Sequence, residues 1–106
     1  MKILDKPITI KELKEIASGT FGDLVKAVVD VDQSLMAIDA ELHADLEALL
    51  LKHGCQQHSL WGINLYPTLG GDGFVEFDSM INMRPSQGNL SRSVDDETIR
   101  GRILEI

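Results

Sequence analysis

The chain has 106 residues, enough for one domain with a single hydrophobic core. Its 17 acidic and 10 basic residues give a net charge of −7, which disfavours binding to nucleic acid or anionic lipid, because phosphate groups need a basic face. Hydrophobic residues make up 43% of the chain, as in ordinary globular proteins, which argues against disorder. We therefore expect one folded domain over residues 1–106.

The chain has one cysteine, Cys55, so it can form neither an internal disulfide nor a cysteine-based zinc site. A lone cysteine suits a reducing compartment. The first residues lack an apolar run long enough for a signal peptide, and no run approaches the roughly 20 residues of a membrane-spanning helix. These features predict a soluble, cytoplasmic protein.

Local patterns in the first half of the chain predict two helices and a hairpin. Thr9 and Glu12 match a capping box that opens a short helix, and Gly19 ends it. Val29 and Val31 belong to an alternation typical of a strand, and a tight turn then leads to its antiparallel partner. Leucines at helical spacing follow. The predicted elements are a helix at 10–18, strands at 26–32 and 35–39, and a helix at 42–53.

The second half predicts two more strands and a last helix. Trp61, Ile63 and Leu65 alternate and are expected on the core side. The following strand pattern is long for one strand, so a bend near Ser79 is an alternative. The last helix meets no C-cap before Ile106, so it is either short or part of a longer native chain. The predicted elements are strands at 60–66 and 74–83 and a helix that starts near 95.

These elements predict an α+β fold in the order α-β-β-α-β-β-α. Hairpins and a meander-like run favour a mainly antiparallel four-stranded sheet. The one-sided apolar alternation of the strands indicates that the helices pack on one face. We expect the other face of the sheet to be partly exposed to water.

Four segments carry a family resemblance: VKAVVD (25–30), ELHAD (41–45), LWGINLYP (60–67) and FDSMINMRPSQGN (77–89). Together they make the chain similar to an uncharacterised prokaryotic family that is classed as a domain of unknown function. The resemblance covers nearly the whole chain. It implies no activity, ligand or catalytic residue.

Acidic side chains on the polar face of the sheet are the first candidate site. Asp30 and Asp32 share one side of a strand, as do Glu76 and Asp78, because side chains alternate with a period of two. If the two strands are neighbours, the carboxylates converge and offer oxygen ligands to Mg²⁺ or Ca²⁺. The alternative is an ordinary solvated face of an acidic protein. We expect no cofactor, with a divalent cation as the alternative.

Histidines and hydroxyls give weaker candidates for chemistry. His43 and Glu47 are four residues apart on one helix face, where they can hold a metal or transfer protons, but a metal site needs more ligands. The alternative is a first helical turn that is rich in acids for dipole reasons. Ser59 and His58 can be drawn into a Ser/His/Asp triad, although no nucleophile elbow supports one.

The segment 84–92 is the most distinctive candidate. Arg84 and Arg92 bracket a loop of Ser, Gln, Gly and Asn that leads to a helix N-terminus. Arginine offers a planar fork to carboxylates and phosphates, and Gly88 lets backbone N–H groups approach a ligand. The alternative is a structural loop in which the arginines pair with acids such as Asp78 or Asp95.

Our leading hypothesis is a non-enzymatic module that binds a small polar ligand or a protein partner. Whether the protein is an enzyme stays open, and no catalytic residue or metal ligand is assigned. One alternative is a divalent-metal-dependent hydrolase of the phosphoester type. Another is a structural subunit of a homo-oligomer, since Met80 interrupts a polar face. The candidate ligand-binding residues are Asp30, Asn64, Glu76, Asp78, Asn82, Arg84, Ser86, Gln87, Asn89 and Arg92.

Overall fold

The computed structural model describes residues 1–104, apart from the side chain of Asp72. Its strands are β1 (Lys2–Leu4), β2 (Val25–Asp30), β3 (Leu35–Ile38), β4 (Leu60–Leu65) and β5 (Val75–Glu76). Its helices are α1 (Ile10–Ser18), α2 (His43–Lys52) and α3 (Glu97–Leu104), and short 3₁₀ turns include η3 (Met80–Asn82) and η4 (Pro85–Gln87). Within residues 1–104, no helix is long and apolar enough to cross a membrane.

The sheet confirms the predicted α+β class and the antiparallel pairing. Its order is β1-β3-β2-β4-β5, and every neighbouring pair is antiparallel. The prediction of four strands is wrong, because β1 adds a fifth strand at the edge beside β3. With only three residues, β1 is too short to show an alternation in the sequence.

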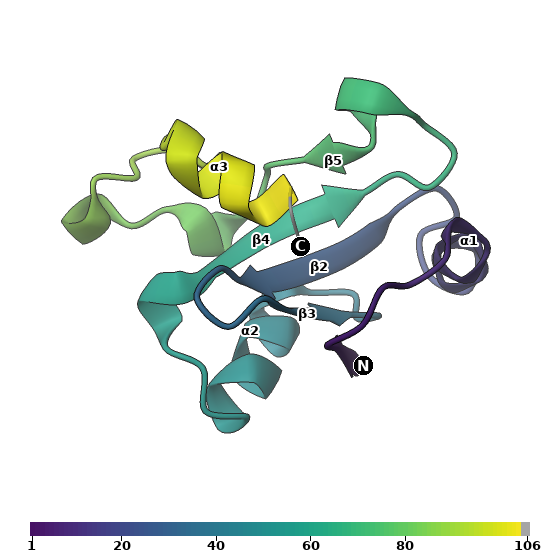
Figure 1. Cartoon of the computed structure of the whole chain (residues 1–106), viewed down its shortest axis with the longest axis horizontal. Helices are drawn as coiled ribbons and strands as arrows, with labels where there is room; N and C mark the ends of the chain where they lie inside the picture. Colours follow the sequence, from purple (N-terminus) through teal and green to yellow (C-terminus); the bar gives the residue numbers. More distant parts are fainter. Residues whose placement is uncertain (105–106) are drawn as a thin grey trace.

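The helices cover both faces of the sheet, so the prediction of one covered face is wrong. On one face, Val28 and Ala37 pack with Leu46 of α2. On the other face, the alternate residues of β2 pack with Leu13 of α1 and Ile103 of α3. Figure 1 shows α3 and α2 on opposite sides of the β2–β4 pair. Little of the sheet is therefore left open to water.

The predicted strand at 74–83 is wrong beyond Glu76. The chain leaves the sheet there, and the Ser79 hydroxyl caps η3 by accepting a hydrogen bond from the backbone N–H of Ile81 at 3.3 Å. Met83, the last residue of the predicted strand, is 45% exposed. The alternation of apolar and polar residues continues through this segment and imitates a strand, but the backbone does not follow it.

Side chains take the place of the missing strand along the edge of β4. The Asn82 amide accepts a hydrogen bond from the N–H of Gly62 at 2.8 Å and donates one to its carbonyl at 2.9 Å. Arg84 donates to the carbonyl of Leu60. Buried backbone groups need such partners, so these two side chains close the edge of β4.

The chain after β5 approaches β4 tightly at Gly62. A Cβ at this position would lie 2.6 Å from the Cβ of Ser79 and 3.2 Å from Cδ2 of His43. Only a residue without a side chain leaves room for both neighbours.

We therefore predict that Gly62→Ala destabilises the protein by about 1–3 kcal/mol through overpacking. Gly101→Ala is the matched control, because a Cβ there meets nothing within 4 Å, and alanine in a helix is expected to stabilise by roughly 0.5–1 kcal/mol. Urea unfolding of both variants measures the effect. Equal stability of the two alanine variants would contradict the tight approach at Gly62.

Candidate functional site

A groove opens at the N-terminal end of α2, between β4, β5 and η3. Its volume is about 510 Å³. Phe21, Leu42 and Met80 form an exposed apolar rim. We call this hollow the α2 groove, and its polar lining consists of Lys26, His43, Asn64, Tyr66, Glu76, Asp78, Ser79 and Arg92.

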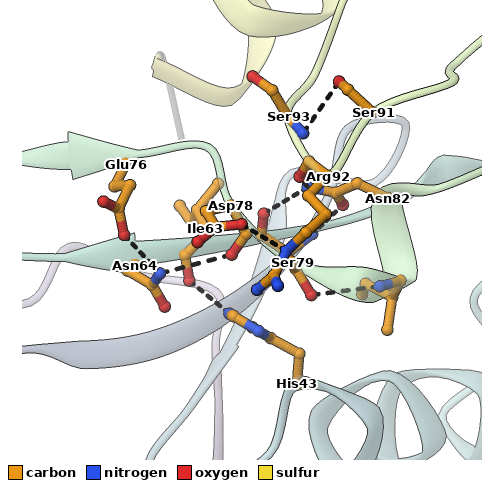
Figure 2. A network of polar contacts seen from close by, with 12 residues as sticks. His43, Ile63, Asn64, Glu76, Asp78, Ser79, Asn82, Ser91, Arg92 and Ser93 are labelled. Carbon is orange, nitrogen blue, oxygen red and sulfur yellow. Dashed lines mark hydrogen bonds and ion pairs between the residues drawn. The ribbon is translucent and has the colours of Figure 1, made fainter.

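Asn64 on β4 forms the floor of the α2 groove and is only 7% exposed. Its Nδ2 donates to Oε1 of Glu76 at 2.8 Å and to the carbonyl of Asp78 at 3.4 Å, which fixes the orientation of the amide. Figure 2 shows its oxygen turned away from Glu76, toward the side on which His43 lies. This buried Oδ1 has no hydrogen-bond partner in the described part of the chain. An unpartnered buried acceptor costs about 1–3 kcal/mol.

Glu76 orders one side of the groove. Its Oε1 accepts from Asn64 and, at 3.1 Å, from the hydroxyl of Tyr66. Burial and then this hydrogen bond raise the pKa of Tyr66, so its hydroxyl stays protonated at neutral pH. One carboxylate oxygen thus holds two neutral side chains in place.

An ion pair between Asp78 and Arg92 borders the other side of the groove. The Nε of Arg92 lies 2.7 Å from Oδ1 of Asp78, and both side chains are about half exposed. The carbonyl of Arg92 accepts from the N–H of Ser79 at 2.9 Å and from the Asn82 amide at 3.0 Å. These contacts, which Figure 2 shows, anchor the end of the segment 84–92 beside the groove.

His43 starts α2, and its side chain is buried. Its Nε2 lies 2.8 Å from the carbonyl of Ile63. A carbonyl can only accept, so Nε2 carries the proton and Nδ1 of the neutral ring is an acceptor. Burial lowers the pKa of His43, Lys26 lowers it further, and the bond to Ile63 opposes both effects.

The N-terminus of α2 lies beside the groove. Its N-cap residue is Leu42, which makes no side-chain capping bond, and Leu42 and Ala44 line the groove beside His43. The first N–H groups of a helix have no partner inside it and carry the positive end of its dipole. Lys26 lies on the strand position paired with Asn64, so the groove offers both donors and acceptors.

The structure keeps Asp30 out of the groove. Asp30 is fully buried, and its Oδ1 accepts from the backbone N–H groups of Asp32 and Gln33 at 2.9 and 3.0 Å, which stabilises the β2–β3 turn. Burial and then the neighbouring Asp30 raise the pKa of Cys55 to about 11. Asp30 therefore has a structural role in the β2–β3 turn.

The acids of β2 and β5 do not converge, because β4 lies between these strands. The expectation of a shared carboxylate cluster is wrong for this reason. Among the described residues, no group of three His, Cys, Asp or Glu side chains is placed to hold a metal ion.

Two predicted site residues, Asn82 and Asn89, are structural. Asn82 closes the edge of β4, as described above. Asn89 is buried, and its Nδ2 donates to the carbonyls of Asn82 and Ser93, each at 2.7 Å. Its Oδ1 accepts from the N–H of Asp95 at 2.8 Å. The side-chain amides of Asn82 and Asn89 are thus both hydrogen-bonded to backbone groups.

Arg84, Ser86 and Gln87 lie apart from the α2 groove. They line a separate hollow of about 380 Å³ on the other side of η3. Arg84 is buried there next to Glu47, while Ser86 and Gln87 are exposed on η4. Of the expected pairings of the two arginines, Arg92 with Asp78 is confirmed, whereas Arg84 pairs with Glu47 instead.

The Ser59 and His58 side chains do meet an acid, but in an order that prevents a catalytic relay. The hydroxyl of Ser59 donates to Asp32, and Nε2 of His58 lies 3.8 Å from the same carboxylate oxygen. The acid stands between the serine and the histidine. A base must contact the hydroxyl that it activates, so this cluster does not form a triad.

Comparison with known proteins gives one match. Residues 2–106 match the family described as a protein of unknown function, DUF5674. The chain belongs to DUF5674. The resemblance to an uncharacterised family is therefore confirmed, and the family carries no assigned activity. No curated protein and no solved structure matches this DUF5674 chain.

Lys26 and Phe21 are among the residues that line the α2 groove of this DUF5674 protein and that the sequence did not indicate as site residues. Lys26 reads as the polar side of a strand, and Phe21 lies in a segment without periodicity. His43 was a candidate only together with Glu47, and the structure places His43 in the groove while Glu47 lines the other hollow. The β2–β4 register places Lys26 opposite Asn64 and would have identified Lys26 as a site residue. This register is known only from the fold, so the sequence alone did not supply the signal.

The environment of His43 predicts a pH dependence of stability. Its pKa in the folded state lies below the ordinary value of 6.5, so the folded state favours the neutral ring. This contribution is complete above pH 6.5 and is lost as the pH falls below it. We predict that His43→Gln, which keeps a donor for Ile63, shows a smaller drop in melting temperature between pH 7.5 and about 5 than the wild type.

His53→Gln is the control, because His53 is exposed after the end of α2. It should keep the wild-type pH profile. Identical profiles for the wild type and both variants would contradict the neutral, buried state of His43.

Proposed function

We propose that this DUF5674 protein is a non-enzymatic binding module that holds a small polar ligand in the α2 groove. The observation that carries the proposal is the buried Oδ1 of Asn64, an acceptor without a partner among residues 1–104. Such an atom is costly unless something donates to it. A ligand N–H or O–H would supply the missing hydrogen bond.

The groove lining indicates the chemistry of the ligand. Asn64 and the Nδ1 atom of His43 are acceptors and call for ligand donors. Lys26 and the uncapped start of α2 favour a carbonyl or an anionic group. The rim of Phe21, Leu42 and Met80 accommodates a short apolar portion. A compact molecule with one donor group, one acceptor group and a small apolar part fits best.

The reactive side chains of the groove are engaged in ways that favour binding over catalysis. The Ser79 oxygen accepts from the N–H of Ile81, and the Nε2 proton of His43 is given to Ile63. Neither atom is placed to activate the other. The proposed setting is the cytoplasm, supported by the single buried cysteine, whose pKa of about 11 keeps its thiol protonated.

A screen of small polar compounds by ¹H–¹⁵N NMR tests the proposal. Amino acids, nucleosides and sugar phosphates serve as probes, and a binder is expected to shift the amides of Ala44, Asn64 and Asp78 together. Asn64→Ala removes the free acceptor and should weaken that binder by about tenfold, equivalent to about 1.4 kcal/mol. Gln33→Ala, which removes an exposed amide outside the groove, should leave the affinity unchanged.

Two outcomes would count against a ligand site in the α2 groove. One is a library in which no compound shifts the groove amides, and the other is a binder that Asn64→Ala leaves unaffected. A shift of the same amides with protein concentration alone would favour the oligomer alternative, with the rim buried between copies.

A further inference from the structure

Two stacked, buried side chains of this protein each have a hydrogen-bond donor that lacks an acceptor in the described structure. The donors are Nη1 of Arg84 and Nε1 of Trp61. The guanidinium carbon of Arg84 lies 4.8 Å from the centre of the Trp61 ring. Arg84 is 9% exposed and Trp61 is 2% exposed. The buried Asn64 oxygen belongs to the α2 groove and does not serve them.

The charge of Arg84 is only partly compensated. Both of its polar contacts use Nη2, which donates to the Leu60 carbonyl and lies 3.5 Å from a Glu47 oxygen. Burial lowers the pKa of Arg84, but an arginine stays charged at neutral pH. A buried cation is stable when oxygen atoms satisfy its remaining N–H groups, and a planar guanidinium suits an oxyanion.

Space for such a group lies beside η4. Arg84, Ser86 and Gln87 line a hollow of about 380 Å³, and Trp61 and Gln87 line a neighbouring one of about 260 Å³. Gln87 lines both hollows, and its exposed side chain donates to the His58 carbonyl at 3.2 Å. A side chain held by an exposed hydrogen bond moves at little cost, so its displacement would join the two hollows.

We infer that Arg84 and Trp61 form an oxyanion-binding site that a carboxylate or phosphate group occupies when Gln87 moves aside. One ligand oxygen accepts from Nη1 of Arg84, and another accepts from Nε1 of Trp61. Ser86 adds an exposed hydroxyl at the mouth. Three carboxylates oppose an anion here, those of Glu47 next to Arg84 and of Asp95 and Asp96 in the hollow next to Trp61, so the affinity is modest. The site is independent of the α2 groove, from which η3 separates it.

Titration of the ¹⁵N-labelled protein with sodium phosphate, and separately with sodium acetate, tests this inference. Trp61 is the only tryptophan, so its indole N–H gives a single, assigned signal. At constant ionic strength and pH 7, the signal should shift and saturate in the millimolar range. Saturation with phosphate alone identifies a phosphate site, whereas saturation with acetate as well identifies a carboxylate site.

A pair of charge-neutral variants separates a specific site from general attraction. Glu47→Gln removes the opposing charge next to Arg84 and should tighten the anion by about tenfold. Asp45→Asn makes the same change in net charge at an exposed position of α2 and should have no effect. Arg84→Lys keeps the positive charge but lacks the planar guanidinium and should abolish saturation. If the lysine variant does not fold, the comparison of Glu47→Gln with Asp45→Asn still tests the site.

The inference would be overturned by an indole signal that does not saturate with either anion. It would equally be overturned if Glu47→Gln and Asp45→Asn changed the titration alike. In either case the Trp61 ring face alone accounts for the buried guanidinium.

Discussion

The hydrogen bonds between the side chain of Asn82 and the backbone of Gly62 are the constraint on which the rest of this structure depends. They let a side-chain amide satisfy the edge of β4 where a continuation of β5 would otherwise be needed. Because Gly62 has no side chain, Ser79 and His43 can both lie against it. Three elements therefore meet at Gly62, namely the end of β5, the start of α2 and the η3 turn. The α2 groove is the space between them.

The same arrangement explains why polar groups on this side of the protein divide into two sets. Met80 and Ile81 of η3 line both the α2 groove and the hollow next to Arg84, so η3 is the wall between them. The groove has balanced charges, with Lys26 and Arg92 facing Glu76 and Asp78. The hollow contains a buried guanidinium with one weak ionic partner. A neutral or zwitterionic molecule suits the first, and an oxyanion suits the second.

Local sequence patterns predicted the helices and the hairpin well, because capping residues and periodicity act over a few neighbouring residues. They failed for 77–83, where apolar and polar residues alternate as in a strand. There the Asn82 side chain, and not a strand, makes the hydrogen bonds to the edge of β4. They also missed that Val28 and Ala37 face a helix of their own. Of the site residues, Asn64, Glu76, Asp78 and Arg92 line one groove, but Asp30, Asn82 and Asn89 satisfy backbone groups, which depends on tertiary contacts that no local pattern reports.

Amide hydrogen exchange at Gly62, measured by NMR under native conditions, tests the closure of the β4 edge most directly. The N–H of Gly62 points away from β2 and is bonded to the Asn82 side chain rather than to a strand. If this bond holds, Gly62 exchanges only on global unfolding, as slowly as the β4 amides that bond to β2. Exchange of Gly62 as fast as the exposed glycines at 70 and 71 would show an open edge and contradict the account.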